Sequence, residues 1–224
     1  MPRSSPQSAQ RYPLTWLLGT EANVRLLREL SRHGGQLSAP SLVARTGLAK
    51  TSVWAGLAVL EAAGAISVAG SGRARLYRLR PDGPLRAPLD ALFAAEEQRF
   101  GAILAAIRDA ARAVRPAPLA VWLYGSVARG EDGPGSDLDV AVLGARALPQ
   151  AAVDAMRDVL RAAGDALGFT ASVVGLSVAD VARLAGAGDP WWVGLVRDAV
   201  VILGPRPEDA VRRPGRAGRR RVAA

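Results

Sequence analysis

The chain has 224 residues, a formal net charge of +9 and no cysteine, and half of its residues are hydrophobic. Without cysteine, disulfides and thiolate metal sites are excluded, and no apolar run is long enough to suggest a membrane span. The excess of basic residues favours a nucleic-acid partner. We expect a cytoplasmic protein with one large domain or two small ones.

The first segment, residues 1–13, reads MPRSSPQSAQRYP and lacks the apolar core of a signal peptide. Its polar, proline-containing composition predicts a disordered lead.

Residues 14–80 show the pattern of a small helical domain that ends in a hairpin. In Glu21–Arg32, Val24, Leu27 and Leu30 recur at helical spacing, and Thr20 is placed as an N-cap. Further helices are expected at Ser38–Arg45 and Lys50–Ala63, and strands at Ala65–Ala69 and Ala74–Arg80.

This order of helix, helix, turn, helix and hairpin predicts a winged helix-turn-helix. The stretch LVARTGLAKTSVWAGLAVLEAAGAI resembles prokaryotic transcription regulators of the ArsR/MarR kind. The resemblance implies binding to duplex DNA and a role in transcription regulation.

The start of the third helix exposes short polar side chains and a base, which suits contact with base edges and phosphates in a major groove. A basic hairpin suits contact with the DNA backbone. A winged helix used only for packing or dimerisation is the alternative, and Trp54 suits base contact, the core or a dimer surface. The candidates for DNA contact are Lys50, Thr51 and Ser52 in the helix and Arg73 and Arg75 in the hairpin.

Residues 81–114 are expected to form a linker and a long connecting helix. Pro81–Pro84 breaks the preceding pattern, and Leu89–Val114 is helical in its periodicity. The helix either connects two domains or packs against a second copy in a homodimer. Its expected apolar stripe is Leu92, Phe93, Phe100, Leu104 and Ile107.

The most informative motif lies in Ala120–Gly144, which reads AVWLYGSVARGEDGPGSDLDVAVLG. Asp137 and Asp139 stand two apart at the start of an apolar run, so on a strand both carboxylates project from one face. Paired carboxylates suit a hard cation such as Mg²⁺. Gly125 and Ser126 form a turn that can offer backbone N–H groups to a phosphate.

The string GSVARGEDGPGSDLDVAVL resembles the minimal nucleotidyltransferases of prokaryotes, within the DNA polymerase beta-like superfamily. These small domains are often met beside toxin–antitoxin partners, which implies a toxin-like protein partner. The resemblance implies an α/β (α+β) domain over residues 115–204, with a small mixed sheet flanked by helices. The implied reaction transfers a nucleotidyl group, AMP from Mg²⁺-ATP, to a protein tyrosine, a nucleic-acid end or an antibiotic.

On this resemblance, Asp137 and Asp139 are the catalytic and metal-binding residues, and Gly125, Ser126 and Arg129 bind the nucleoside triphosphate. Arg129 is equally explained as a solvated loop charge. The alternative for the whole motif is a hairpin with a glycine-rich loop and two solvated aspartates.

The third strand of the domain departs from the family pattern. The family places a third carboxylate there, near Ser172 in FTASVVGL, but this strand has no acidic residue. Ser172 is no comparable base at neutral pH, and Asp180 lies beyond the strand. Two hypotheses therefore stand: a nucleotidyltransferase with a weakened base, or a DNA-binding regulator whose degenerate domain only binds nucleotide or a partner.

The remaining pattern completes the domain and ends in a basic tail. Residues 205–224 crowd arginine among proline and glycine, which predicts a disordered segment that either binds polyanions or is simply solvated. The expected elements before it are a helix at Ala151–Leu167, a strand at Phe169–Val174, helices at Val178–Ala185 and Pro190–Arg197, and a strand at Val200–Leu203.

Overall fold

The computed structural model describes residue 14 and residues 17–212, and the chain divides into two compact units, residues 1–98 and 99–224. The boundary falls inside helix α5, Arg86–Ala113. The predicted lead over residues 1–13 lies outside the described residues. Each unit is built around its own buried residues.

The first unit packs helices against a three-stranded antiparallel sheet of order β1-β3-β2. Thr20 caps α2 by accepting a hydrogen bond from the Asn23 backbone, and Ser38 caps α3 in the same way from Ser41. Its elements are α2 (Glu21–His33), β1 (Leu37–Ser38), α3 (Ala39–Thr46), α4 (Lys50–Ala62), β2 (Ile66–Ala69), the short η1 (Gly72–Ala74) and β3 (Leu76–Leu79).

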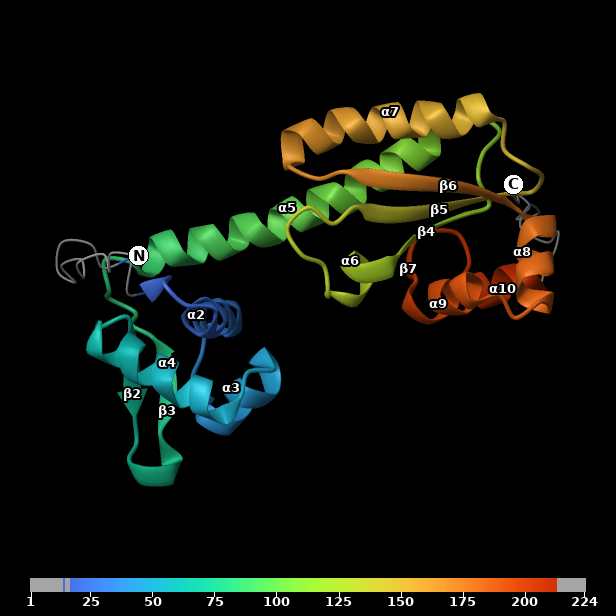
Figure 1. The fold of residues 1–224 in the computed structure, drawn as a ribbon. Helices are drawn as coiled ribbons and strands as arrows, with labels where there is room; N and C mark the ends of the chain where they lie inside the picture. Colours follow the sequence, from blue (N-terminus) through green and yellow to red (C-terminus); the bar gives the residue numbers. More distant parts are fainter. Residues whose placement is uncertain (1–13, 15–16, 213–224) are drawn as a thin grey trace, which may run out of the picture. The chain divides into compact units, whose positions relative to one another are not determined.

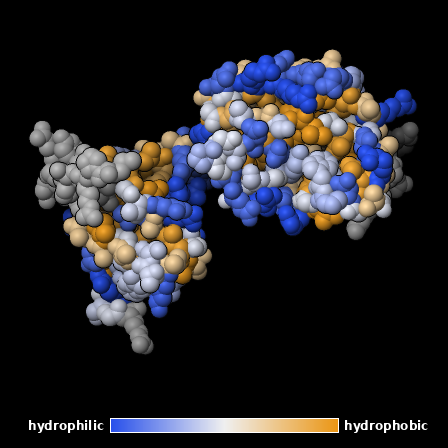
Figure 2. All heavy atoms as spheres, in the orientation of Figure 1, coloured by the Kyte–Doolittle hydropathy of each residue, from blue (hydrophilic) through white to orange (hydrophobic). Residues whose placement is uncertain are grey.

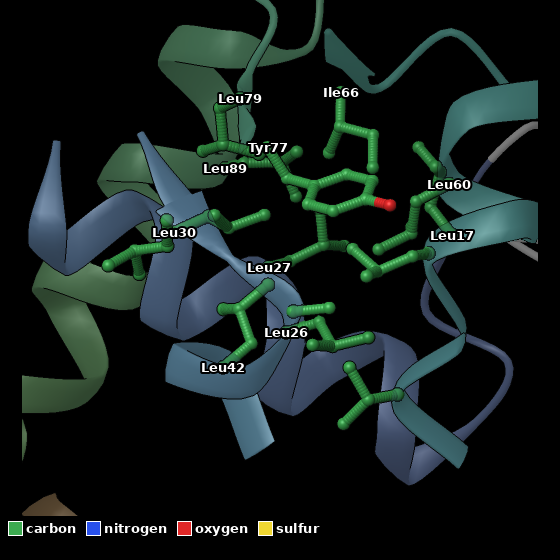
Figure 3. Packing of buried hydrophobic residues seen from close by; sticks show 14 of the residues in the cluster. Leu17, Leu26, Leu27, Leu30, Leu42, Leu60, Ile66, Tyr77, Leu79 and Leu89 are labelled. Carbon is green, nitrogen blue, oxygen red and sulfur yellow. The ribbon is translucent and has the colours of Figure 1, made fainter. Parts of the chain in front are cut away.

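Leucines from several helices surround the ring of Tyr77 in the core of this unit (Figure 3). The predicted apolar stripe on α2 packs against the core, with Val24 at its edge. Leu26, Leu27 and Leu30 are buried, whereas Val24 is only partly buried. The helix turns its Asn23–Leu27–Leu30 side inward, so Val24 lies at the edge of the buried face.

The second unit is a four-stranded sheet of order β6-β5-β4-β7, in which β5 and β6 are parallel and the other pairs antiparallel. Helices α5 and α7 cover one face, and α8, α9 and α10 cover the other (Figure 1). This mixed sheet flanked by helices confirms the predicted fold class. The elements after α5 are β4 (Ala120–Tyr124), α6 (Gly125–Arg129), β5 (Leu138–Gly144), α7 (Gln150–Leu167), β6 (Ala171–Ser177), α8 (Val178–Gly186), α9 (Pro190–Asp198), β7 (Val200–Leu203) and α10 (Pro207–Arg212).

The amphipathic pattern of α7 is plain in the structure. Val153, Met156 and Leu160 are buried against the sheet, while hydrophilic side chains cover the outward side of the helix (Figure 2). Such a one-sided apolar stripe is what fixes a helix on a sheet face.

The predicted stripe of the long helix is partly wrong. Leu92 is 50% exposed and Phe100 is 43% exposed. The predicted Ile107 is buried and Leu104 packs against the core; in the second unit, α5 also buries Ile103, Ala110 and Ala111.

The segment after residue 204 also differs from the expectation of disorder. Pro207–Arg212 forms helix α10, and Ala210 is buried with the residues of α8 and α9. The buried Trp122 donates its indole N–H to the backbone oxygen of Pro205 at 2.8 Å. Residues 213–224 of the predicted tail lie outside the described residues.

Candidate functional site

Asp139 lies on strand β5 and faces the side of the sheet that carries α8 and α9. Its neighbours Leu138 and Val140 are buried in the cluster beneath α5 and α7, so alternation directs Asp139 to the opposite face. Asp137 directly precedes the strand, is exposed, and accepts a hydrogen bond from the Thr170 hydroxyl.

The two carboxylates influence each other electrostatically. Burial raises the pKa of Asp139, the negative charge of Asp137 raises it further, and the positive charge of Arg129 opposes the shift. A pair of neighbouring carboxylates with no cation among them disfavours double ionisation. The pair is therefore suited to a cation that would neutralise it.

Gly125 makes room for the Asp139 carboxylate. It is the first residue of α6 and has a φ of 78°, a conformation that L side chains rarely adopt. A Cβ built on it would lie 2.3 Å from Oδ2 of Asp139. The strand register and the glycine thus bring the Gly-Ser turn and the second aspartate together, as the motif predicts.

Ser126 follows in the same turn and is half-buried. Its backbone oxygen accepts a hydrogen bond from the Glu131 backbone at 2.9 Å, which folds the start of the glycine-rich loop back onto α6. Gly125 and Ser126 therefore stand beside Asp139, where the resemblance places the triphosphate.

Tyr124 is a residue that the sequence reasoning did not single out for the site. It pairs directly with Asp139 across the antiparallel strands β4 and β5. Burial raises the pKa of its phenol, with a further contribution from the charge of Asp139, while a hydrogen bond with Trp191 acts in the opposite direction. The two rings meet edge to face, with centroids 5.5 Å apart. In the sequence, only its position directly before the Gly-Ser motif could have pointed to Tyr124 as a residue of the site.

Arg129, a predicted phosphate contact, is held by two acidic side chains. Its Nε donates to Glu131 at 2.7 Å, and one terminal nitrogen donates to Asp198 at 2.6 Å. These two hydrogen bonds raise the pKa of Arg129, the Glu131 bond more than the Asp198 bond. Asp198 was missed because it lies 69 residues away in the chain.

Ser172 occupies the position where the family pattern would place a third carboxylate. In the parallel pairing of β5 and β6, it stands directly beside Asp139. It is exposed, so this end of the sheet face is open to solvent. Asp180 does not substitute, because it forms the capping box of α8 with Ser177. Within residue 14 and residues 17–212, no group of three or more His, Cys, Asp or Glu side chains is placed to hold a metal ion.

A cavity of about 810 Å³ lies near the glycine-rich loop, on the other side of the sheet from Asp139. Leu123 and Leu138, which point away from that aspartate, form part of its wall together with Phe100 and Phe169. Neither Asp137 nor Asp139 lines it. The carboxylate pair therefore lies outside this cavity.

The DNA-contact candidates lie in the first unit. Lys50 and Thr51 are exposed at the start of α4, and Ser52 is half-buried beside them. Trp54 is 41% exposed, so it is not a core residue. Arg75 donates to Glu61 at 2.8 Å, and its guanidinium lies 5.5 Å from the centre of the Tyr77 ring. Arg73 lies in η1, and its side chain is outside the described structure.

Comparison with known proteins places the motif within a recognised family segment. Residues 104–191 match the family model described as a nucleotidyltransferase domain. No curated protein gives a significant match. Within the described part of the chain, no helix is both long and apolar enough to cross a membrane.

Three solved structures of toxin–antitoxin proteins resemble the chain. A toxin–antitoxin structure with AMP-PNP has 21% identity and a TM-score of 0.37, covering 50% of this chain and 82% of its own. A mutant of the MntA–HpeT pair has 20% identity and a TM-score of 0.36, covering 47% and 78%. The tri-AMPylated HEPN toxin of Shewanella oneidensis with its MNT antitoxin has 22% identity and a TM-score of 0.32, covering 50% and 76%.

Proposed function

We propose that the second unit transfers a nucleotidyl group, AMP from Mg²⁺-ATP, to the hydroxyl of an acceptor. The observation that carries this proposal is the contact of Gly125 with the Asp139 carboxylate, beside Asp137 and next to Ser126. It joins a carboxylate pair to a backbone turn at an end of the sheet where the neighbouring Ser172 is exposed. The family match over residues 104–191 supports the same reaction.

The donor set fits Mg²⁺, because carboxylate oxygens are the ligands that this hard cation takes. Asp137 and Asp139 would hold it. Burial and the charge of Asp137 raise the pKa of Asp139, and a bound cation would favour its ionised form. Bound there, the cation would neutralise negative charge on the phosphates and on the leaving pyrophosphate. The Gly125–Ser126 turn would orient the phosphates through its backbone.

In the proposed transfer, the acceptor oxygen bonds to the α-phosphorus of ATP, and the bond from that phosphorus to the oxygen bridging to the β-phosphorus breaks. Pyrophosphate leaves with the electron pair of the broken bond, and the acceptor hydroxyl gives up its proton to water, which reaches the exposed position of Ser172. Ser172 stands where a carboxylate would receive that proton, and its hydroxyl is a poor base at neutral pH. We therefore expect ATP binding with slow transfer.

The test measures Mg²⁺-ATP affinity and the transfer of label from α-labelled ATP, with pyrophosphate release, to candidate acceptors. Asp139→Asn should abolish Mg²⁺-dependent ATP binding while the fold persists. Asp132→Asn is the matched control, because Asp132 is an exposed acid of the neighbouring loop. Unchanged ATP affinity in Asp139→Asn would refute the site assignment.

The second candidate function is a DNA-binding regulator, in which the first unit is a winged helix-turn-helix and the second only senses nucleotide or a partner. Two observations favour it. Lys50 and Thr51 are exposed at the start of α4, as a recognition helix requires. Ser172 replaces a carboxylate in the other unit. A toxin-like protein partner or a second copy of the chain fits either function.

The two functions separate in one pair of measurements on the full chain. The regulator binds duplex DNA in a salt-sensitive way, because binding releases counterions from the phosphates, and shows no label transfer from ATP. The enzyme transfers label whether or not DNA is present.

A further inference from the structure

Helix α9 contacts both ends of α6. At the start of α6, Trp191 of α9 packs edge to face on Tyr124, the residue that immediately precedes Gly125. At its end, Asp198, the last residue of α9, accepts a hydrogen bond at 2.6 Å from Arg129, the last residue of α6. One helix therefore fixes the two ends of the segment that contains the Gly-Ser turn.

The carboxylate of Asp198 is built into this contact rather than solvated. Its side chain is only 6% exposed, and it also accepts from Arg197, at 2.6 and 3.1 Å. Hydrogen bonds from Arg197 and then Arg129 lower the pKa of Asp198 to about 2, so it stays ionised at neutral pH. Charge-assisted bonds of this kind are roughly twice as strong as neutral ones.

Helix α6 has little of its own to fix its position. It spans five residues, Gly125–Arg129, and none of them is buried. An isolated helix of one turn is unstable, because nucleation costs more than one turn of hydrogen bonds returns. Its orientation therefore depends on strand β4 before it, on the packing of Val127 and Ala128 against the core beneath α5 and α7, and on the contacts that α9 makes.

We propose that Asp198 and Trp191 are positioning residues, which hold α6 so that Gly125 stays against the Asp139 carboxylate. As a role in catalysis, this rests on the proposed nucleotidyl transfer. Arg129 then serves as the anchor of α6 instead of a free cation for phosphate, since Glu131 and Asp198 already share its guanidinium.

The experiment is amide hydrogen exchange on the full chain without nucleotide, followed by Mg²⁺-ATP binding. The reporters are the amides of Gly130 and Glu131, which donate to backbone oxygens of α6 at 3.1 and 2.9 Å. The variants are Asp198→Asn and the conservative Asp198→Glu. Asp158→Asn is the matched control, because Asp158 forms an exposed pair with Arg161 at 3.0 Å on α7.

We expect Asp198→Asn to speed exchange at Gly130 and Glu131 by about tenfold or more, as local opening of a charge-anchored segment would. Amides of β4 and β5 should keep their protection. Asp198→Glu should restore most of the slow exchange, and Asp158→Asn should change nothing. Mg²⁺-ATP affinity should fall in Asp198→Asn and recover in Asp198→Glu.

A folded Asp198→Asn variant with unchanged exchange at Gly130 and Glu131 would overturn the proposal, as would an equal effect of Asp158→Asn. If Asp198→Asn does not fold, Trp191→Phe decides, since it keeps an aromatic ring beside Tyr124 but removes the indole N–H and part of the ring surface that packs there. The same local increase in exchange is then expected, and its absence refutes the proposal. If the unmodified chain binds no Mg²⁺-ATP, the enzymatic proposal fails, while the exchange data still decide whether α9 positions α6.

Discussion

The carboxylate of Asp139 occupies the space in which a side chain on Gly125 would begin. A Cβ on this glycine would stand 2.3 Å from Oδ2 of the aspartate, and the backbone there has a φ of 78°. Both facts require glycine, for different reasons.

Gly125→Ala should disrupt the site by more than its backbone cost. Forcing alanine into a left-handed conformation costs roughly 1–2 kcal/mol, and the added methyl also displaces the Asp139 carboxylate. Gly130→Ala isolates the first effect, because Gly130 has a φ of 68° and nothing within 4 Å of its Cβ position. Chemical unfolding and ATP titration of both variants test this. Equal losses of ATP affinity would show that the contact with Asp139 is irrelevant.

The stability of the chain should depend on pH through Asp139. Its pKa is raised in the folded state, so its favourable contribution is full below the unfolded pKa of about 3.9 and is lost as pH rises through the folded value. Asp139→Asn removes this dependence. Relative to the parent, the variant should therefore gain melting temperature between pH 4 and pH 7 in the absence of divalent cations. A difference that stays constant over this range would contradict the assignment.

Ser172→Asp should accelerate nucleotidyl transfer, because it restores an acidic group directly beside Asp139. General-base assistance is typically worth about 10²–10⁴-fold in rate. The added negative charge should also lower stability without Mg²⁺ and make stability more dependent on it. Ser172→Asn is the uncharged control of similar size. Label transfer from α-labelled ATP is the measurement, and fast transfer by the unmodified chain would show that another group receives the proton.

Lys50→Ala should weaken duplex-DNA binding uniformly across sequences and reduce the slope of log affinity against log salt by about 1. Arg161→Ala, at an exposed position on α7, is the control with the same loss of charge. If Lys50→Ala and Arg73→Ala both bind as well as the parent, while removal of residues 213–224 eliminates binding, the arginine-rich end of the chain is the anion site.

Most elements of both units could be predicted from the sequence because local signals mark them, whereas the two-residue strand β1 and helix α10 were not expected. Thr20, Ser38 and Asp189 cap their helices as the residue types indicate, and the alternation before and after Asp139 sets the strand register. The proximity of the Gly-Ser turn to the aspartate pair could likewise be predicted, because one short connection joins the two segments.

The long helix was misread because periodicity does not say what covers a face. Phe100 has the right phase to lie on the buried side of α5, yet no residue from 94 to 102 belongs to either flanking core cluster. Phe100 instead lines the cavity beside the glycine-rich loop. An apolar stripe can therefore be continuous along a helix while its middle residues are not buried in a core.

The anchoring of Arg129 could not be predicted, because it depends on a distant residue. Nothing local to Arg129 distinguishes a phosphate contact from an ion pair with Asp198. The same holds for Trp191, whose partner Tyr124 lies far away in the sequence, at the end of strand β4. Such pairs become visible only when the topology is known.

The strand order also sets a sequence of assembly. β4 lies between β5, which follows it closely, and β7, which is the last strand of the sheet. During synthesis, the polar backbone along one edge of β4 stays open until Val200–Leu203 have left the ribosome, and an open edge invites pairing with other chains. The nascent chain therefore contains both aspartates of the site before β7 is available to pair with β4. A chain shortened before Val200 would keep the motif and aggregate through that edge.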